Sequence, residues 1–175
     1  EIIDLQYSED RILAQDIKSQ INIPPFNNSA VDGYALLKKD LNLKKTFICK
    51  KRIAAGDNKK IVVKSGEAVR VFTGAKMPSN SSTVVMQENV RVKGNYITLL
   101  KTPQFGENYR IKGEDIKKNK MILPIGTKIN HQNLNLRAAA GIRKIKVYKK
   151  IKIGFFTSGN EFRKPTKNLK NAEIN

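Results

Sequence analysis

The regular recurrence of turn-forming residues in the middle of the chain constrains its fold most. Between about residues 19 and 124, short runs of alternating apolar and polar side chains are separated by Gly, Asn and Pro. Alternation with a period of two is typical of half-buried strands, and the separating residues favour turns. The pattern predicts a compact β-rich lobe over 23–117 whose apolar positions form a core. The predicted strands are 46–49, 60–63, 68–72, 83–88 and 96–100.

Two helices are predicted outside this lobe. Residues 8–17 have the pattern of a short helix whose first residue is the N-cap. A second helix is predicted over about 134–140, capped by Asn130 or Asn133. It is expected to end at Gly141, because glycine is strongly preferred just after the last helical residue.

The sequence after the second helix predicts a strand. Residues 142–152 alternate apolar with basic side chains, as a half-buried strand does. The β-rich lobe is therefore expected to be inserted in a mixed α/β lobe formed by 1–22 and 118–148. Together these segments make one N-terminal region, 1–148.

The last residues predict the opening of a further α/β domain over 149–175. A β-branched and aromatic run at 150–156 leads into a Thr-Ser-Gly-Asn-Glu loop, which is typical of a strand followed by a binding loop. A parallel sheet needs several strands joined by crossovers of about a dozen residues or more. This domain is therefore incomplete, and the chain is expected to be an α+β multidomain fragment of a longer protein.

Charge is the most unusual feature of the composition. The chain has 34 Lys and Arg against 15 Asp and Glu, a formal net charge of +19. Such a charge favours a polyanionic partner. The lysines, however, are spread along the chain as pairs, and aromatic residues make up only 7% of it, with no Trp. General enrichment in surface lysine explains this pattern better, so no nucleic-acid partner is expected.

Several classes of protein are excluded by composition. No stretch approaches the roughly 18 apolar residues of a membrane span, and the first residues lack the pattern of an export signal. The lone Cys49 excludes an internal disulfide and a zinc site built on cysteines, and His131 is the only imidazole. A soluble, cytoplasmic protein without a membrane partner is expected.

The candidate chemistry begins in the stretch Pro-Pro-Phe-Asn-Asn-Ser-Ala-Val-Asp-Gly-Tyr-Ala at 24–35. The two prolines restrict the backbone where it enters, and the Asn-Asn-Ser that follows is typical of turns. The stretch presents one carboxylate, Asp32, beside a glycine, Gly33, which lets other groups approach closely. On these residues alone it is either a tight turn between strands or a rigid loop that presents Asp32 for chemistry.

This stretch resembles the signature loop of the MoeA/gephyrin family, the molybdopterin molybdenumtransferases, whose usual form is close to P-P-F-D-N-S-A-M-D-G-Y-A. Asn27 stands where the family usually has aspartate, and Val31 stands where it usually has methionine. Asp32, the most important acid of the family's loop, is retained. Three further segments resemble family motifs in the same order, so the resemblance covers nearly the whole chain.

The second segment, Arg-Val-Phe-Thr-Gly-Ala-Lys-Met-Pro at 70–78, resembles the family's R-I-M-T-G-A-x-x-P. Taken alone it predicts a turn, in which Thr73 offers a hydroxyl, Gly74 lets the backbone approach an anion and Lys76 adds charge. The Val-Val-Met-Gln-Glu run at 84–88 fits the family strand A-V-V-x-x-E. The resemblance implies that Thr73 and Gly74 bind substrate oxygens.

The third segment, 108–116, resembles N-x-R-x-x-G-E-D-I and contains Arg110, Glu114 and Asp115. Without the resemblance, the two acids are solvated salt-bridge partners. With it, Asp115 is expected to face the active-site cleft.

The fourth segment, 157–161, resembles S-T-G-D-E-L. It departs from that pattern at Ser158, Asn160 and Phe162, and it retains Glu161. Backbone N–H groups in such a loop suit phosphate or pterin oxygens, whereas Glu161 alone is equally consistent with a helix cap.

The resemblance implies an enzyme that transfers molybdenum from molybdate to adenylylated molybdopterin, releases AMP and uses Mg²⁺. It also implies a homodimer whose cleft lies between the β lobe of one subunit and the pterin domain of the other, with molybdopterin adenylyltransferase as a further partner. This fragment alone is expected to be inactive. A non-catalytic, gephyrin-like scaffold is the alternative function, and a basic nucleic-acid-binding protein comes third.

The residues implied by the resemblance fall into three groups. The catalytic group is Asp32, Thr73, Asp115 and Glu161. The cofactor-binding group is Gly74, Arg110, Ser158 and Gly159. Because hard carboxylate oxygens suit Mg²⁺, Asp32 and Asp115 are also the expected metal ligands.

Overall fold

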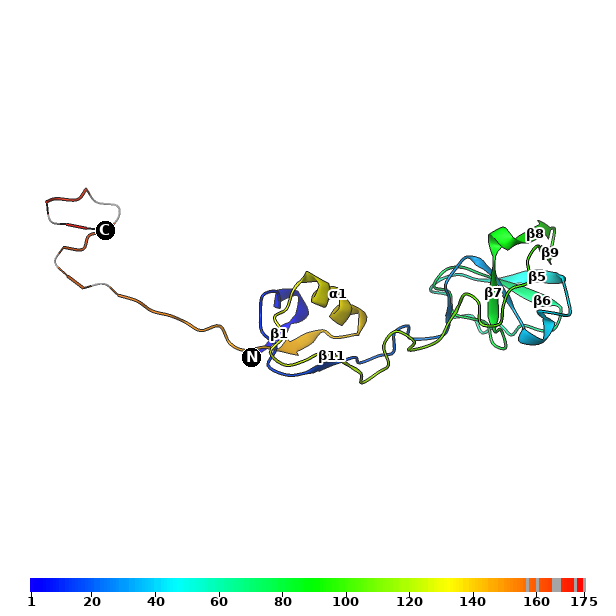
Figure 1. The fold of residues 1–175 in the computed structure, drawn as a ribbon, viewed down its shortest axis with the longest axis horizontal. Helices are drawn as coiled ribbons and strands as arrows, with labels where there is room; N and C mark the ends of the chain where they lie inside the picture. The colour runs from blue at the N-terminus through cyan, green and yellow to red at the C-terminus, as the bar shows by residue number, and fades with distance from the viewer. Residues whose placement is uncertain (157, 160, 165–167, 172, 175) are drawn as a thin grey trace.

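The computed structural model describes residues 1–156, 158–159, 161–164, 168–171 and 173–174. Figure 1 shows two folded lobes joined by paired connecting segments, with an extended C-terminal segment that leaves the smaller lobe. Among the described residues the regular structure is mostly β, with one short α-helix. The expected β-rich middle is therefore confirmed, whereas helix contributes less than expected.

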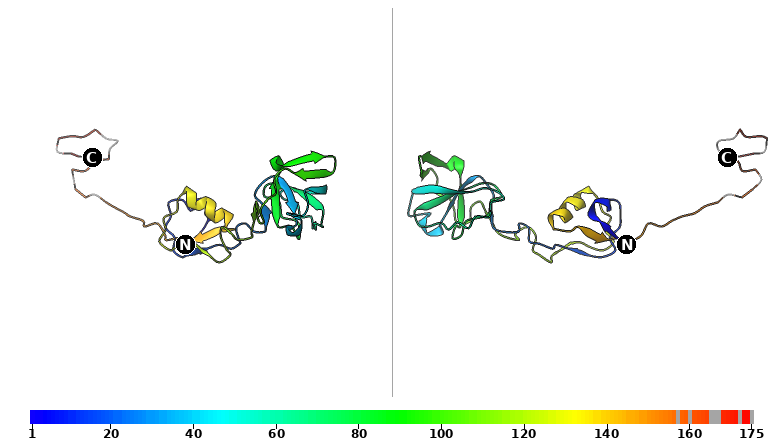
Figure 2. Two further views of the ribbon diagram at one scale, coloured as in Figure 1. Left: turned by 45° about the vertical axis from the view of Figure 1, so that its right-hand side comes forward. Right: turned by 180° about the vertical axis from the view of Figure 1, so that it is seen from behind.

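A six-stranded sheet forms the larger lobe, in the strand order β7–β4–β6–β5–β9–β8. β5 and β6 run parallel, and the other neighbouring strands run antiparallel. The sheet curls strongly in Figures 1 and 2. The strands are β4 (Gly33–Leu36), β5 (Thr46–Ile53), β6 (Glu67–Val71), β7 (Thr83–Met86), β8 (Val90–Lys93) and β9 (Tyr96–Leu99). Short 3₁₀ turns follow β4 and β7, at η2 (Lys38–Asp40) and η3 (Gln87–Asn89).

The strand predicted at 60–63 is wrong. Only an isolated bridge, between Val62 and Ser79, forms there. Val63 is nevertheless buried, so its apolar side chain serves the core without a ladder of strand hydrogen bonds.

Strand β4 is buried on both faces because a hydrophobic cluster packs against each. Tyr34 and Leu36 belong to one cluster, together with Phe47. Ala35 belongs to the other, together with Val69. Complete burial of a large apolar side chain contributes about 1.5–3 kcal/mol, so β4 anchors the lobe.

The β4–β7 pairing brings two backbones together at Gly33. A Cβ atom on this residue would lie 2.1 Å from the carbonyl oxygen of Val85 and 2.8 Å from a methyl carbon of Val84. Val84 and Val85 are themselves buried in β7. Glycine is therefore required here for close approach.

We expect Gly33→Ala to lower the free energy of unfolding by at least about 2 kcal/mol, because overpacking a closed contact forces the backbone apart. Thermal and urea unfolding measure the effect. Gly154→Ala is the matched control, because a Cβ there has no atom within 4 Å. Equal stability of the two variants would contradict the close approach.

The smaller lobe pairs the start of the chain with its later part. β1 (Ile2–Asp4) runs antiparallel to β12 (Lys144–Lys146), and β2 (Ile17–Lys18) pairs with β11 (Met121–Leu123). A helix, α1 (His131–Ala139), packs beside the 3₁₀ turn η1 (Leu5–Tyr7). The shared core is Leu13, Ile17, Ile129, Ala140, Ile142, Ile145 and Val147.

The predicted helix at 8–17 is wrong. Ser8 is buried, and its hydroxyl donates back to the carbonyl of Leu5, so it closes η1 and caps no following helix. Leu13 forms an isolated bridge with Val147, and Ile17 belongs to β2. Long-range pairing therefore uses the backbone groups that a local helix would have satisfied.

The second predicted helix is confirmed, with an earlier start. α1 begins at His131, and the side-chain oxygen of Asn130 accepts from the backbone N–H of Asn133 at 2.9 Å. Gly141 follows the helix with φ of 81°. Both end signals therefore act where the sequence places them.

Two connecting segments run side by side between the lobes (Figure 1). The backbone N–H of Asn119 donates to the carbonyl of Ser19 at 2.8 Å, and that of Ile23 donates to Ile116 at 2.8 Å. The Ile23–Pro24 peptide bond is cis. The chain thus enters and leaves the β lobe through one hydrogen-bonded ribbon.

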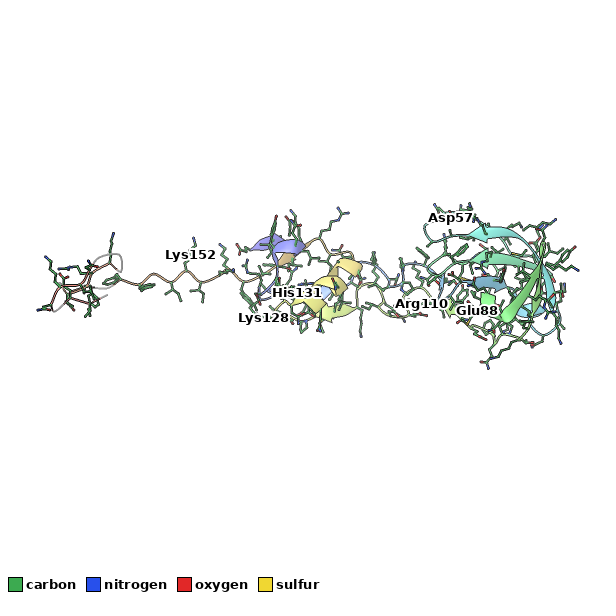
Figure 3. All side chains as sticks on the ribbon, turned by 90° about the horizontal axis from the view of Figure 1, so that it is seen from above. Asp57, Glu88, Arg110, Lys128, His131 and Lys152 are labelled. Atoms are coloured by element: carbon green, nitrogen blue, oxygen red, sulfur yellow. The ribbon has the colours of Figure 1, made fainter. Side chains whose placement is uncertain are left out.

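The strand predicted within 150–156 is wrong. The segment has no strand pairing, and it extends away from the smaller lobe, where Figure 3 labels Lys152. Its apolar side chains are exposed, with Ile151 at 87% and Phe155 at 91%. A strand needs a neighbour for its backbone groups, and the described residues offer none here.

Arg137 is an unusual member of the smaller lobe because its side chain is completely buried. Its Nε donates to the carbonyl of Asn133 at 3.0 Å, one turn earlier in α1. Its Nη1 and Nη2 have no hydrogen-bond partner among the described residues. Burial lowers the pKa of this guanidinium.

We expect Arg137→Met to raise the stability of the chain by about 1–4 kcal/mol, because a buried charge without partners loses hydration and gains little in return. Thermal unfolding tests this expectation. Arg143→Met is the control, because Arg143 is exposed and its loss should change stability by less than about 0.5 kcal/mol. Destabilisation by Arg137→Met would show that the guanidinium has an acceptor.

Candidate functional site

Three of the segments singled out in the sequence converge at one edge of the β lobe. The signature stretch 24–35 lies between the other two. On one side, the backbone N–H of Ser29 donates to Ala75 at 3.0 Å, and that of Gly74 donates to Ser29 at 2.8 Å. On the other side, β3 (Asn28–Ser29) pairs with β10 (Tyr109–Arg110). The stretch is therefore a rigid loop held from both sides, and not a free turn.

Asp32 and Thr73 form the centre of this convergence. Oδ1 of Asp32 accepts from the backbone N–H and from the hydroxyl of Thr73, each at 2.8 Å. These two bonds, the backbone one first, hold the pKa of Asp32 below its ordinary value, and the charge of Arg70 acts in the same direction. The carboxyl group is therefore ionised throughout the neutral range. Its Oδ2 accepts no hydrogen bond from the described residues.

Arg70 and Gln87 belong to a network of contacts around Asp32. The guanidinium carbon of Arg70 lies 4.9 Å from the ring centre of Tyr34 and 5.1 Å from that of Phe72. Its Nη2 donates to the side-chain oxygen of Gln87. The backbone N–H of Gln87 in turn donates to the carbonyl of Asp32 at 3.1 Å. The network holds the charged guanidinium of Arg70 near the Asp32 carboxylate. It also holds the backbone of Asp32 in place.

Sequence reasoning gave Arg70 no role beyond its place in a motif, and gave Gln87 none. The signal that identifies them is strand pairing: Arg70 lies opposite Tyr34 across β4 and β6. Residues directly opposite each other on adjacent strands lie on the same face of a sheet and can interact. Because Arg70 and Tyr34 are far apart in the sequence, a local sequence pattern does not reveal this contact.

We expect Thr73→Val and Arg70→Met each to raise the pKa of Asp32, because each removes a group that stabilises the ionised carboxylate. Carbon-13 NMR titration of the Asp32 carboxyl measures the change. Since the folded pKa is depressed, the associated stability is present at neutral pH and is lost on acidification through that pKa. Lys59→Met, which removes a cation bonded to Asp57, is the control. An Asp32 pKa unmoved in both test variants would contradict this network.

Arg110 binds both acids of the third segment. Its Nε donates to Glu114 at 2.6 Å, and its Nη2 donates to Asp115 at 2.5 Å. These bonds, the one to Asp115 first, raise the pKa of Arg110. The backbone N–H of Ile111, and then Arg110, lower the pKa of Glu114. Figure 3 places Arg110 where the β lobe meets the connecting segments.

This geometry constrains the expected role of Asp115. Its Oδ2 is engaged by Arg110, so the acid is an ion-pair partner in this structure, as its sequence surroundings alone predict. Its side chain is still 48% exposed. Asp115 is therefore accessible to a ligand that displaces or shares Arg110.

The fourth segment lies apart from the other three. Thr157 and Asn160 are outside the described residues. Ser158, Gly159 and Glu161 are exposed on the C-terminal segment, far from the β lobe in Figures 1 and 2. The structure thus brings Asp32, Thr73 and Gly74 together with the segment of Arg110 and Asp115, and leaves the remaining predicted site residues separate.

A metal ion has few candidate ligands here. The described residues contain no group of three or more His, Cys, Asp and Glu side chains placed to hold one. Mg²⁺ commonly takes one or two carboxylates and completes its shell with water and substrate phosphate oxygens. The free Oδ2 of Asp32 fits that use, whereas a cage built from these residues alone does not form.

No described helix combines the length and the apolar character needed to cross a membrane.

The fold and the converging loops place this chain in one class of protein. Residues 1–141 match the family model described as the MoeA N-terminal region (domain I and II). The chain belongs to this family, and the resemblance drawn from its motifs is confirmed.

Named relatives agree with this assignment. The chain is 37% identical over 175 residues to a molybdopterin molybdenumtransferase of Haemophilus influenzae, covering 99% of this chain and 43% of the relative. It is 36% identical over 166 residues to one of Nostoc, covering 92% of this chain and 38% of that protein. A solved structure of a molybdopterin biosynthesis MoeA protein from Pyrococcus horikoshii superposes with a TM-score of 0.89 at 31% identity, over 99% of this chain and 46% of the other. The chain spans less than half the length of these relatives.

Proposed function

We propose that the protein containing this chain acts in molybdenum cofactor biosynthesis, transferring molybdenum from molybdate to adenylylated molybdopterin with release of AMP. The observation that carries the proposal is the Asp32–Thr73 pair, an ionised carboxylate fixed where three family motifs meet. The names of the relatives supply the substrate class.

The residues of the β lobe have distinct tasks in this proposal. Thr73 orients Asp32 through two bonds to one oxygen, which leaves the other oxygen free to position a water molecule or a cation. Gly74, with φ of 78°, allows the backbone to approach a substrate oxygen where a side chain would be strained. Arg110 balances negative charge that arrives beside Asp115.

Mg²⁺ fits this site as a group shared with the substrate. Asp32 and Asp115 would hold it, and when bound it would neutralise charge on phosphate oxygens. The net charge of the chain, +19, attracts molybdate and phosphate anions.

The fourth segment lies apart from Asp32, which supports a site that is completed by residues of another subunit. Ser158, Gly159 and Glu161 belong, in this proposal, to the pterin-binding half, which meets Asp32 across a homodimer interface. The fragment alone is then inactive. A cytoplasmic protein that receives its substrate from a molybdopterin adenylyltransferase is consistent with this assignment.

The test uses the full-length protein with adenylylated molybdopterin, Mg²⁺ and micromolar molybdate. We expect molybdate-dependent AMP release, and a loss of about a hundredfold or more in Asp32→Asn, because the amide retains the shape without the charge. Asp10→Asn is the matched control, because Asp10 is an exposed ion-pair partner of Lys128 in the smaller lobe. Its activity should equal that of the unchanged protein.

Three outcomes oppose the proposal. A folded dimer that releases no AMP would favour a gephyrin-like scaffold without turnover. Steeply salt-dependent binding of nucleic acid by that inactive dimer would favour the basic nucleic-acid-binding alternative. Equal losses in both Asp variants would remove Asp32 from the chemistry.

A further inference from the structure

A cavity opens on the β lobe, and its lining does not include Asp32, Thr73 or Arg70. Its volume is about 410 Å³, within the usual range for pockets that take small molecules. It lies between the start of the signature stretch, the loop after Ala75 and the segment that follows β10. The lining residues are Pro25, Phe26, Asn27, Lys76, Met77, Pro78, Ser79, Asn80, Ser81, Tyr109 and Lys112. We call it the Lys76–Lys112 pocket.

Hydrogen bonds fix the walls of this pocket. The side-chain amide of Asn27 donates to the hydroxyl oxygen of Tyr109 at 2.8 Å and accepts from the backbone N–H of Lys112 at 2.7 Å. The backbone N–H of Met77 donates to the carbonyl of Asn27 at 2.9 Å. The three wall segments are thus tied through Asn27, so the cavity is formed before any ligand arrives.

The charge of the lining is entirely positive. No Asp or Glu lines the pocket, whereas two lysines from different segments do. Neither Lys76 nor Lys112 forms an ion pair with a described residue. Two lysines without an ion-pair partner in the lining of one cavity favour an anionic ligand.

Tyr109 adds a directed donor to these charges. Its hydroxyl oxygen already accepts from Asn27, and its own proton has no acceptor among the described residues. Ammonium and hydroxyl donors together match the oxygens of a phosphate group, which accepts several charge-assisted hydrogen bonds. Phe26, 38% exposed, and Met77 supply an apolar side to the same cavity.

We propose that the Lys76–Lys112 pocket binds a small phosphate-bearing molecule, with both ammonium groups and the Tyr109 hydroxyl holding the phosphate oxygens. This site goes beyond the proposed transferase chemistry, and neither depends on the other. Its binding is measured without turnover, so its failure leaves the AMP-release test untouched.

The test is titration calorimetry of the whole chain with inorganic pyrophosphate at about 0.15 M salt, where weak interactions between exposed charges are screened. The double variant Lys76→Ala/Lys112→Ala removes both charges from the pocket. Its matched control is Lys117→Ala/Lys118→Ala, an exposed pair outside the pocket with the same charge loss. We expect saturable binding to one site, weakened about tenfold or more in the pocket variant and unchanged in the control.

A second variant acts on the same lining without removing a lysine. Asn27→Asp retains the side-chain oxygen that accepts from the backbone N–H of Lys112. It also introduces a negative charge that repels an anion, so it should weaken pyrophosphate binding about tenfold or more. Circular dichroism establishes that each variant is folded. Equal weakening in both lysine pairs would assign the affinity to overall charge and overturn the proposal, as would the absence of saturation in the unchanged chain.

Discussion

The clamping of β4 between β6 and β7 is the interaction on which the rest of the β lobe depends. Both faces of β4 are buried, and its first residue, Gly33, lies so close to the carbonyl oxygen of Val85 that a side chain has no space. Asp32 immediately precedes this strand. The position of the acid is therefore set by main-chain packing, and Thr73 reaches it because β6 ends beside it.

Acids in this basic chain are held mainly by backbone N–H groups. Asp32 accepts from Thr73, Asp57 from Ala54 and Glu114 from Ile111. The buried Asp40 likewise accepts from Gly66 at 2.8 Å. A backbone N–H cannot move away or be screened as an exposed lysine can. The few carboxylates therefore stabilise particular turns, although 34 cations surround them.

The sequence allowed local features to be predicted more fully than distant ones. The end of α1 at Gly141 and an N-cap at Asn130 or Asn133 were predicted from residues close together in the chain, and the structure assigns the cap to Asn130. The residues of 24–35 alone left a tight turn and a rigid loop open, because the loop is held by distant segments at Ala75 and Tyr109. The helix expected at 8–17 failed because Leu13 pairs with Val147, which no local window contains. The resemblance named Asp32, Thr73 and Asp115 as candidate site residues, and the structure joins the first two by a hydrogen bond.

The surroundings of these residues were harder to predict. The support of Asp32 by Arg70 and Gln87 required the strand pairing to be known, since Arg70 meets Tyr34 only across the sheet. The engagement of Asp115 by Arg110 was foreseen only as a generic salt bridge. The strand expected at 150–156 failed for a related reason, because a strand is defined by its neighbour as much as by its own residues.

The hydrogen-bonded ribbon between the lobes has an architectural consequence. Its two segments pair at Ile23 and Ile116, so the β lobe begins and ends at adjacent points in space. A unit with neighbouring ends can be cut out, replaced by a short loop, or rejoined with new termini while its internal pairings stay intact. The β lobe that contains Asp32 is therefore a structural unit inserted in the smaller lobe. Evolution can exchange or retain it independently of the smaller lobe.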